Sequence, residues 1–321
     1  MTLQATIDLL WHQLGWPLLR LLLFISIGLL VANFIEALNW TRKMALVARP
    51  LTRFGHLSAT AGAAFSMAFF SGVSANTMLA EAYEQEKIGK RELILANLFN
   101  SLPTYFLHLP TTFFITAPLI RGAAFIYIGL TLGAAVVRTL TISLLGRFLL
   151  PEQEPAARSG PEEGQEQTLS SAWQRTLVRF RKRIRKIVRY TVPIYILFFL
   201  LAQAGLFARL ETFMAAHLPF LAWLSPQAIS IITLQVAAEF TAGLAAAGAL
   251  LQDGSMEASQ VVLTLLIGNV LSSPVRAIRH QFPYYAGIFR PRLAVQLIAA
   301  SQSFRTLSIA LVAFLYYLGA R

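Results

Sequence analysis

Two arginines and one glutamate lie deep within apolar stretches of the sequence, where an unpaired charge costs on the order of a few kcal/mol or more. Arg138 and Arg305 begin two similar segments, Arg-Thr-Leu-Thr-Ile-Ser-Leu and Arg-Thr-Leu-Ser-Ile-Ala-Leu. Because guanidinium groups form paired hydrogen bonds with carboxylate and phosphate oxygens, this pair predicts a site for an anionic substrate. An architectural role, in which each arginine holds free backbone carbonyls, is an equal alternative. Glu239 has Ala68 at the matching place of the other half, and it is a candidate carrier of a coupling proton or cation.

Four short polar segments also interrupt apolar stretches, two in each half of the chain. Two of them contain small and polar residues, and two place asparagine and serine just before Pro103 or Pro274. Irregular backbone inside a membrane needs protein or a wet cavity to satisfy its polar groups. The sequence therefore predicts a substrate site that includes Ser71, Gly72, Ser74, Asn76, Asn97, Asn100, Ser101, Thr241, Gly243, Asn269, Ser272 and Ser273. Close helix packing by small residues is the alternative, and it accounts less well for the amides.

Other reactive groups are scarce. The sequence has no cysteine, which excludes disulfides, thiolate metal sites and thiol catalysis. No His, Asp and Glu residues have metal-ligand spacing, and Asp8 and Asp253 are the only aspartates, which argues against an intramembrane enzyme. We therefore predict a protein without enzymatic activity, without a cofactor and without a bound metal ion.

The composition indicates which environment surrounds these residues. Of the 321 residues, 56% are hydrophobic and only 13% are charged, about half of what a soluble domain carries. This balance excludes a water-soluble enzyme, a DNA-binding module and a disordered scaffold. The net charge of +12 then reports basic loops on the inner side of a membrane and no nucleic-acid partner.

Eight apolar stretches are long enough to be membrane elements, at 17–39, 57–82, 93–118, 123–150, 190–207, 226–251, 260–289 and 293–319. We predict that 57–82 and 226–251 are re-entrant hairpins of two half-helices, with full spans as the alternative. The hairpin arrangement places most basic residues inside and both termini outside a cell (inner or cytoplasmic) membrane. The last inside group of basic residues is Arg276, Arg279, Arg290 and Arg292.

A polar stretch separates the two halves. Residues 151–170 have the Pro, Gly, Glu and Ser bias of a disordered linker, and residues 172–190 carry eight basic residues among apolar ones. The second pattern predicts an amphipathic helix on an anionic lipid surface. The predicted parts are a first repeat (1–150), a cytoplasmic linker (151–189) and a second repeat (190–321).

The two halves are similar in sequence. A shift of 171 residues aligns 69–103 with 240–274 without a gap and with eight identities, and the two arginine segments share five residues of seven. The predicted fold is an all-α polytopic membrane protein of two inverted-topology repeats, each with about three transmembrane helices, one re-entrant helical hairpin and Pro-broken helices. Secondary transporters commonly have this construction, with the substrate held near the membrane midplane where the repeats meet.

Two segments of the first half carry a resemblance to a known family. Phe-Ser-Gly-Val-Ser-Ala-Asn (70–76) and Leu-Ala-Asn-Leu-Phe-Asn-Ser-Leu-Pro (95–103) resemble the Gate, or nucleoside-recognition, domain. Concentrative nucleoside transporters, the membrane part of bacterial ferrous-iron transporter B and spore maturation proteins A and B share that domain. The sequence lacks the GTP-binding loop and cysteines of the iron transporters, and it is shorter than the nucleoside transporters. It is therefore most similar to stand-alone Gate-domain proteins, over roughly 57–145 and 226–312.

These observations predict a membrane transporter or permease that moves a small polar, anionic solute through a midplane site between the repeats. Within transport, the alternative is a nucleoside or divalent-metal carrier of the Gate type, with Glu239 and the asparagines as ligands. From another class, the alternative is a subunit that assembles with a second Gate-domain protein or with itself and transports nothing.

Overall fold

The structure is a computed structural model of the chain. It describes residues 41–152, 224–237 and 240–319 continuously, and scattered residues between 4 and 30 and between 173 and 209. Glu239 lies outside the described residues. The first and fifth apolar stretches and the linker with its basic segment lie largely outside the described residues.

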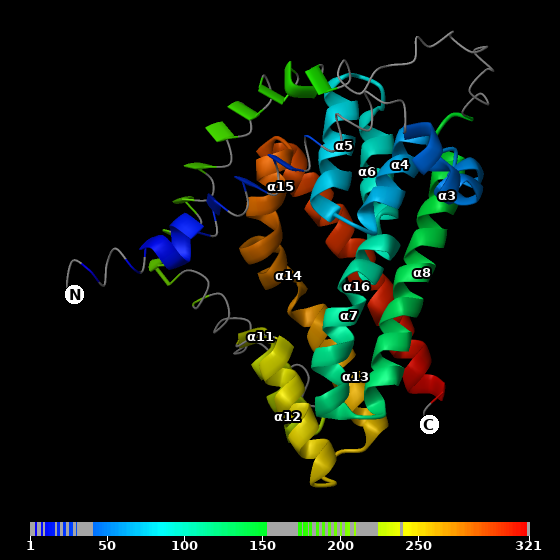
Figure 1. Cartoon of the computed structure of the whole chain (residues 1–321). Coiled ribbons are helices and arrows are strands. Elements are labelled where there is room, and N and C mark those ends of the chain that lie inside the picture. Colours follow the sequence, from blue (N-terminus) through cyan, green and yellow to red (C-terminus); the bar gives the residue numbers. More distant parts are fainter. Residues whose placement is uncertain are drawn as a thin grey trace. The chain divides into compact units, whose positions relative to one another are not determined.

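Helices are the only regular elements among the described residues, which confirms the all-α class. In the first half the order is α3 (Thr41–Phe54), α4 (Ala59–Ala68), α5 (Gly72–Glu84), α6 (Lys90–Phe99), α7 (Ser101–Ile120) and α8 (Ala123–Leu149) (Figure 1). In the second half it is α11 (Pro226–Ala237), α12 (Phe240–Gln252), α13 (Ala258–Leu271), α14 (Ser273–Arg276), the π-helical turn η3 (Ala277–Gln281), α15 (Phe282–Ile288) and α16 (Pro291–Gly319). Near the N-terminus, one further π-helical turn, η1, covers Trp11–Gly15.

The stretch 57–82 forms two short helices, α4 and α5, that pack against each other. The chain breaks at 69–71 because Ser71 adopts an extended conformation and starts α5 by accepting a hydrogen bond from the Ser74 N–H at 3.1 Å. Neither helix exceeds 13 residues, or about 20 Å, which is too short to cross a bilayer alone. The stretch 226–251 likewise forms the paired short helices α11 and α12.

Both prolines of the broken helices stand just after a change of helix. Asn100 separates α6 from α7, with Pro103 in the first turn of α7. Ser272 separates α13 from α14, and the chain bends there by 47°. Since proline cannot donate a backbone hydrogen bond, it fits the first turn of a new helix, and these breaks place asparagines next to free backbone groups.

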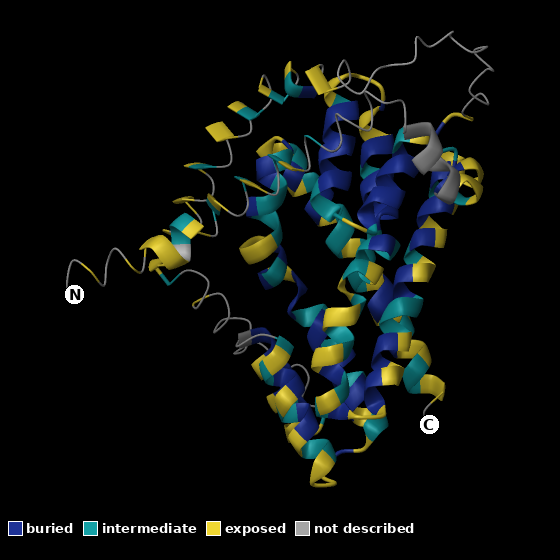
Figure 2. Cartoon of the chain, in the orientation of Figure 1, coloured by how far each residue is buried: buried dark blue, intermediate teal, exposed yellow. Residues whose placement is uncertain are grey.

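Two helices are long and apolar enough to cross a membrane, and the bent pair from Ala258 to Ile288 could form a third span. They are α8, with 27 residues, and α16, with 29 residues. Both expose large apolar side chains that water would not favour, among them Phe125, Phe148, Leu307 and Phe314. Figure 2 shows exposed residues along α8. The length and the apolar surface together indicate association with a membrane.

The described helices belong to two compact units. Unit 1 comprises Met1–Leu107, Thr139–Phe199 and Pro283–Leu297, and unit 2 comprises His108–Arg138, Leu200–Phe282 and Ile298–Arg321. Each unit therefore contains the paired short helices of one half of the sequence together with a segment from the other half. Unit 1 takes Pro283–Leu297 from the second half, and unit 2 takes His108–Arg138 from the first.

The core of unit 1 is built on α4, whose residues from Ala61 to Ala68 are all buried. Alanine and glycine dominate this helix, so α3, α5 and α6 approach it closely. The rings of Phe65 and Phe99 then lie 4.4 Å apart between centroids and connect α4 to the end of α6.

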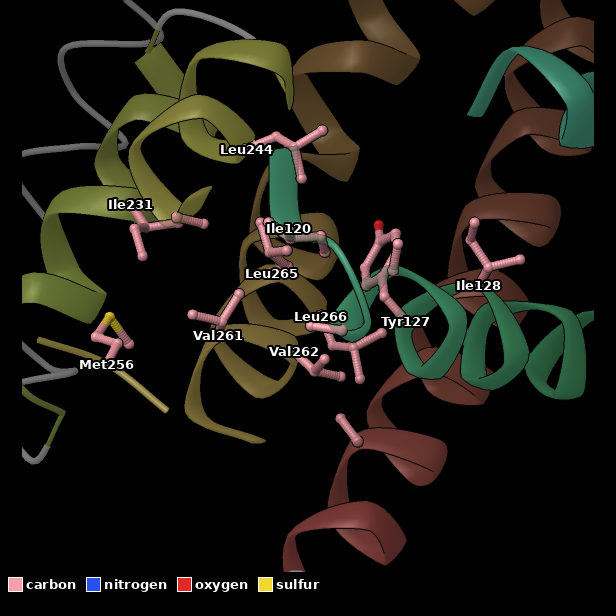
Figure 3. Close-up of a cluster of buried hydrophobic side chains, with 14 of the residues drawn as sticks. Ile120, Tyr127, Ile128, Ile231, Leu244, Met256, Val261, Val262, Leu265 and Leu266 are labelled. Atoms are coloured by element: carbon pink, nitrogen blue, oxygen red, sulfur yellow. The ribbon is translucent and has the colours of Figure 1, made fainter. Parts of the chain in front are cut away.

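The core of unit 2 is a cluster of aliphatic side chains around one tyrosine. Leu265 and Leu266 of α13 lie with Ile231 of α11, Leu244 of α12 and Tyr127 of α8 (Figure 3). All five are buried, which fixes the end of α13 against the other helices. That end carries the polar residues considered next.

Candidate functional site

The polar cluster of unit 2 begins at Asn269, three residues before the break at Ser272. Because the helix ends here, the Asn269 carbonyl accepts side-chain donors: Ser273 Oγ at 3.0 Å, Ser272 Oγ at 3.4 Å and Arg276 Nη2 at 2.9 Å. Two predicted serines and one arginine therefore meet at one backbone oxygen.

The Asn269 side chain connects three elements. Its Oδ1 accepts hydrogen bonds from Arg276 Nη2 at 2.8 Å and from Arg305 Nη2 at 3.3 Å. Its Nδ2 donates to Tyr127 Oη at 3.0 Å. The amide oxygen thus faces two cations, while the amide nitrogen faces the core phenol.

Arg138 of α8 joins this cluster through Ser308 of α16. Its Nη1 donates to Ser308 Oγ at 2.9 Å, and the Ser308 hydroxyl donates to the Arg305 carbonyl at 2.9 Å. The guanidinium of Arg305 also lies close enough to those of Arg138 and Arg276 for the charges to repel. We call Arg276, Arg305 and Arg138 the arginine row, with Arg305 in the middle.

Two members of the arginine row lie near the centres of the long helices, and the third, Arg276, ends the short helix α14. Arg305 is the central residue of α16, and Arg138 is two residues from the centre of α8. All three arginines are partly buried. Among the residues that the structure describes, none of the three pairs with a carboxylate. Arg138 and Arg305 therefore place positive charge in the middle of apolar helices, and Arg276 adds a third charge beside Arg305.

Gln235 on α11 is a second buried polar group of unit 2. It is 3% exposed, and neither its Nε2 nor its Oε1 has a hydrogen-bond partner among the described residues. Its side chain lies against Gly243 of α12 and Gly268 of α13, where a Cβ atom would collide with it. The two glycines therefore leave space for the Gln235 amide, which lies next to Gly268, the residue that precedes Asn269. A buried amide without a hydrogen-bond partner destabilises a fold.

Unit 1 has a polar cluster of a different kind, made of two asparagines and two tyrosines. Asn97 Nδ2 donates to Asn76 Oδ1 at 2.8 Å and to Tyr285 Oη at 3.3 Å, and Tyr285 Oη donates back to Asn97 Oδ1 at 3.4 Å. Asn76 Nδ2 donates to Tyr284 Oη at 2.9 Å. We call these four residues the amide–phenol cluster. It carries no formal charge.

Asn100 lies next to the break between α6 and α7 and is 5% exposed. Neither its Oδ1 nor its Nδ2 has a hydrogen-bond partner among the described residues. Ser101, the next residue, lies with its hydroxyl 3.4 Å from Thr139 Oγ1. Asn100 is thus the unsatisfied amide of unit 1, as Gln235 is of unit 2.

The predicted residues of the short helix pairs have local roles in the structure. Ser71 caps α5, and its Oγ also accepts from Ser74 Oγ at 3.0 Å, while Gly72 is the first residue of that helix. Thr241 is exposed in the first turn of α12. Gly243 packs against Gln235.

The structure therefore brings together Asn269, Ser272, Ser273, Arg138 and Arg305 in unit 2, and Asn76 with Asn97 in unit 1. Sequence reasoning missed five residues of these clusters: Arg276, Tyr127, Gln235, Tyr284 and Tyr285. It counted Arg276 among the basic residues of an inside loop, whereas the structure places Arg276 in α14.

The sequence did contain a signal for Gln235, because it is a polar amide inside the apolar stretch 226–251. The described residues contain no group of three or more His, Cys, Asp and Glu side chains that could hold a metal ion.

Three similar proteins each match between 85% and 97% of the chain. No protein-family model matches it, and no solved structure matches it. The uncharacterized protein MJ0871 of Methanocaldococcus jannaschii is 24% identical over 285 residues, 87% of each chain. From the same organism, the uncharacterized protein MJ1556 is 26% identical over 97% of this chain and 95% of its own, and the uncharacterized protein MJ0880 is 22% identical over 85% and 88%. The similarity thus includes both halves of the sequence.

Proposed function

We propose that the chain is a multi-pass membrane transporter for a small anionic solute, and that the arginine row of unit 2 binds this solute. The observation that carries the proposal is a row of three arginines, two at the centres of the long apolar helices and one at the bend after α13, without a carboxylate partner among the described residues. In such surroundings guanidinium charges need a counter-charge, and a solute anion supplies it.

The architectural alternative predicts that the arginines hold backbone carbonyls. Among the described residues, Arg276 alone does so, at the Asn269 carbonyl. Among described residues, Arg138 and Arg305 donate to side-chain oxygens, those of Ser308 and Asn269. A side-chain acceptor can be exchanged for a solute oxygen without breaking a helix, so this pattern favours binding.

The membrane arrangement that we propose is two inverted repeats with a Gate-like core. The reciprocal exchange of segments between the halves supports it, because each compact unit contains one helix pair and a segment from the other half. In this arrangement both termini lie outside, residues 151–189 lie in the cytoplasm, and residues 172–190 contact anionic lipid.

A neutral polar solute, such as a nucleoside, is the second candidate. Asn100 favours it, since this buried amide in unit 1 has an unused donor and acceptor among the described residues. A neutral solute with both kinds of group would satisfy it without any charge.

Uptake by proteoliposomes tests the proposal. The purified full-length protein is reconstituted, and uptake of radiolabelled sulfate is measured for the wild type, Arg305→Ala and Arg138→Ala. Because each variant removes a charged hydrogen-bond donor, worth about 1.5–3 kcal/mol, we expect uptake to fall about ten- to a hundredfold.

The matched controls are Arg292→Ala, an exposed arginine of the same helix α16, and Arg147→Ala, near the end of α8. Both should retain uptake within about twofold. Equal uptake by all four variants would remove the arginine row as the site. Uptake of a nucleoside that depends on Asn100 and not on Arg305 would favour the second candidate.

A further inference from the structure

We propose that the solute of the arginine row is a small oxyanion with two negative charges, a phosphate or sulfate ester or a dicarboxylate. This inference rests on the proposed function, because it names the substrate class of the same site. Three properties of the row carry it: its charge, its free donors and the middle position of Arg305.

The charge of the row sets the charge of the solute. Arg138, Arg276 and Arg305 contribute three positive charges, because arginine does not lose its proton in proteins. Glu239 is the only acid deep within an apolar stretch, so even if it faces the row two positive charges remain. A monoanion would leave at least one of these charges uncompensated in apolar surroundings, whereas a dianion compensates two of them and leaves at most one.

Most N–H donors of the row have no hydrogen-bond partner among the residues that the structure describes. Each guanidinium has five N–H groups, yet the hydrogen bonds with described residues involve only Nη2 of Arg276, Nη2 of Arg305 and Nη1 of Arg138. Arg276 Nε is buried without a partner among those residues. Paired N–H groups that point in a fixed fork suit the oxygens of phosphate, sulfate and carboxylate groups.

The middle position of Arg305 favours a solute with several oxygens. Arg305 shares the Asn269 oxygen with Arg276 on one side, and its carbonyl shares the Ser308 hydroxyl with Arg138 on the other. A solute bound to Arg305 is therefore within the influence of both outer cations. A single oxygen cannot reach all three forks, whereas three or four oxygens around one or two charge centres can.

Equilibrium binding to the detergent-purified full-length protein tests this inference independently of transport. Titration calorimetry compares sulfate and fumarate, which are dianions, with nitrate, a monoanion. We expect sulfate or fumarate to bind at least about tenfold more tightly than nitrate, and the tighter of the two distinguishes a tetrahedral oxyanion from a dicarboxylate. Nitrate binding as tight as both would overturn the inference.

Phenyl phosphate tests the charge directly, since its second pKa is about 6. Between about pH 8 and about pH 5 it changes from a dianion to a monoanion, and we expect its affinity to fall about tenfold. Sulfate remains a dianion over this range and controls for pH effects on the protein, so its affinity should change less than about twofold. An equal change for both ligands contradicts the inference.

A charge variant separates recognition from folding. Arg138→Gln lowers the charge of the row by one, so we expect the ratio of sulfate to nitrate affinity to fall about tenfold. Arg138→Lys keeps the charge and should keep the ratio within about threefold, as should Arg147→Gln on the same helix. A purely structural role would weaken both anions equally and leave the ratio unchanged, which would count against the inference.

The two proposals fail in different ways. Tight, row-dependent sulfate binding without uptake by proteoliposomes overturns transport and supports the dianion site. Uptake of nitrate that depends on Arg305 overturns the dianion and supports transport.

Discussion

The polar clusters of the two units share one motif and differ in charge. Asn97 and Asn269 each stand two residues before the last residue of their helix, α6 or α13, just ahead of a break. Each bonds a tyrosine from the other half of the sequence, Tyr285 or Tyr127. In unit 1 a second asparagine, Asn76, completes the cluster, whereas in unit 2 Arg276 and Arg305 take its place.

The difference in charge suggests that the amide–phenol cluster stabilises a helix break, while the arginine row is suited to bind a ligand. The amide–phenol cluster satisfies the groups of Asn97 by neutral partners, so it stabilises the break by itself. The arginine row has donors without partners and charge without a counter-charge among the described residues, so an anion would stabilise it. The same motif thus serves structure in one unit and is available for recognition in the other.

Replacing each asparagine by aspartate is the strongest test of this comparison. Asn97→Asp places a charge among neutral groups, and we expect a loss of about 3–5 kcal/mol of stability because the charge is buried without a partner. Asn269→Asp places the same charge beside Arg276 and Arg305, so the protein should stay folded while sulfate affinity falls at least about tenfold. Thermal unfolding in detergent and calorimetry measure the two effects.

The two aspartate variants control for each other, because each replaces an asparagine by a side chain of the same shape at the same helix position. Leucine variants at both positions report the loss of the amide without a charge. Similar destabilisation by both aspartate variants would show that the two clusters do not differ in their electrostatic surroundings.

Removing one phenol hydroxyl from each cluster gives a smaller effect. Tyr127 Oη is the partner of Asn269 Nδ2, so Tyr127→Phe leaves that buried donor unpaired and should cost about 1–3 kcal/mol. Tyr285→Phe should cost about 0.5–1.5 kcal/mol, because Asn97 Nδ2 keeps its bond to Asn76 and the bond that Asn97 Oδ1 loses is long, at 3.4 Å. Thermal unfolding compares them, with Tyr316→Phe, a partly buried tyrosine of α16, as the control. A larger loss for Tyr285→Phe contradicts the assigned partners.

Gln235→Leu should have the smallest effect on stability. Since the amide has no partner among the described residues, its removal should be neutral or raise stability by up to about 1 kcal/mol. Gln302→Leu is the matched variant, and it should lower stability because Gln281 loses a hydrogen bond of 2.7 Å. If Gln235 contacts the solute, Gln235→Leu also weakens sulfate binding several-fold without destabilising the protein. A clear loss of stability would show that Gln235 has a structural partner.

Several features of the fold could be predicted from sequence because they depend on local patterns. The apolar stretches predicted α8 and α16, and Pro103 and Pro274 predicted the breaks near Asn100 and Ser272. The cost of placing a charge in an apolar stretch predicted Arg138 and Arg305 as site residues, and both lie in the arginine row.

The remaining site residues depend on contacts between distant segments. Tyr284 and Asn76 are 208 residues apart, and Tyr127 and Asn269 are 142 apart, so no local pattern pairs them. The positive charge of Arg276 suggested a loop residue, whereas in the structure its side chain donates to Asn269 across the bend at Ser272. The predicted repeats also gave no sign that a serine would cap a helix, as Ser71 does.

The fixed orientation of Asn269 has a consequence for release. Its Oδ1 already accepts a hydrogen bond from Arg276 and one from Arg305, in the way that an oxygen of a bound solute would. In the proposed transporter, an anion that binds these two N–H groups displaces the amide oxygen, which returns when the anion departs. We expect this competition to keep the affinity of the proposed site moderate, so that the solute can also leave.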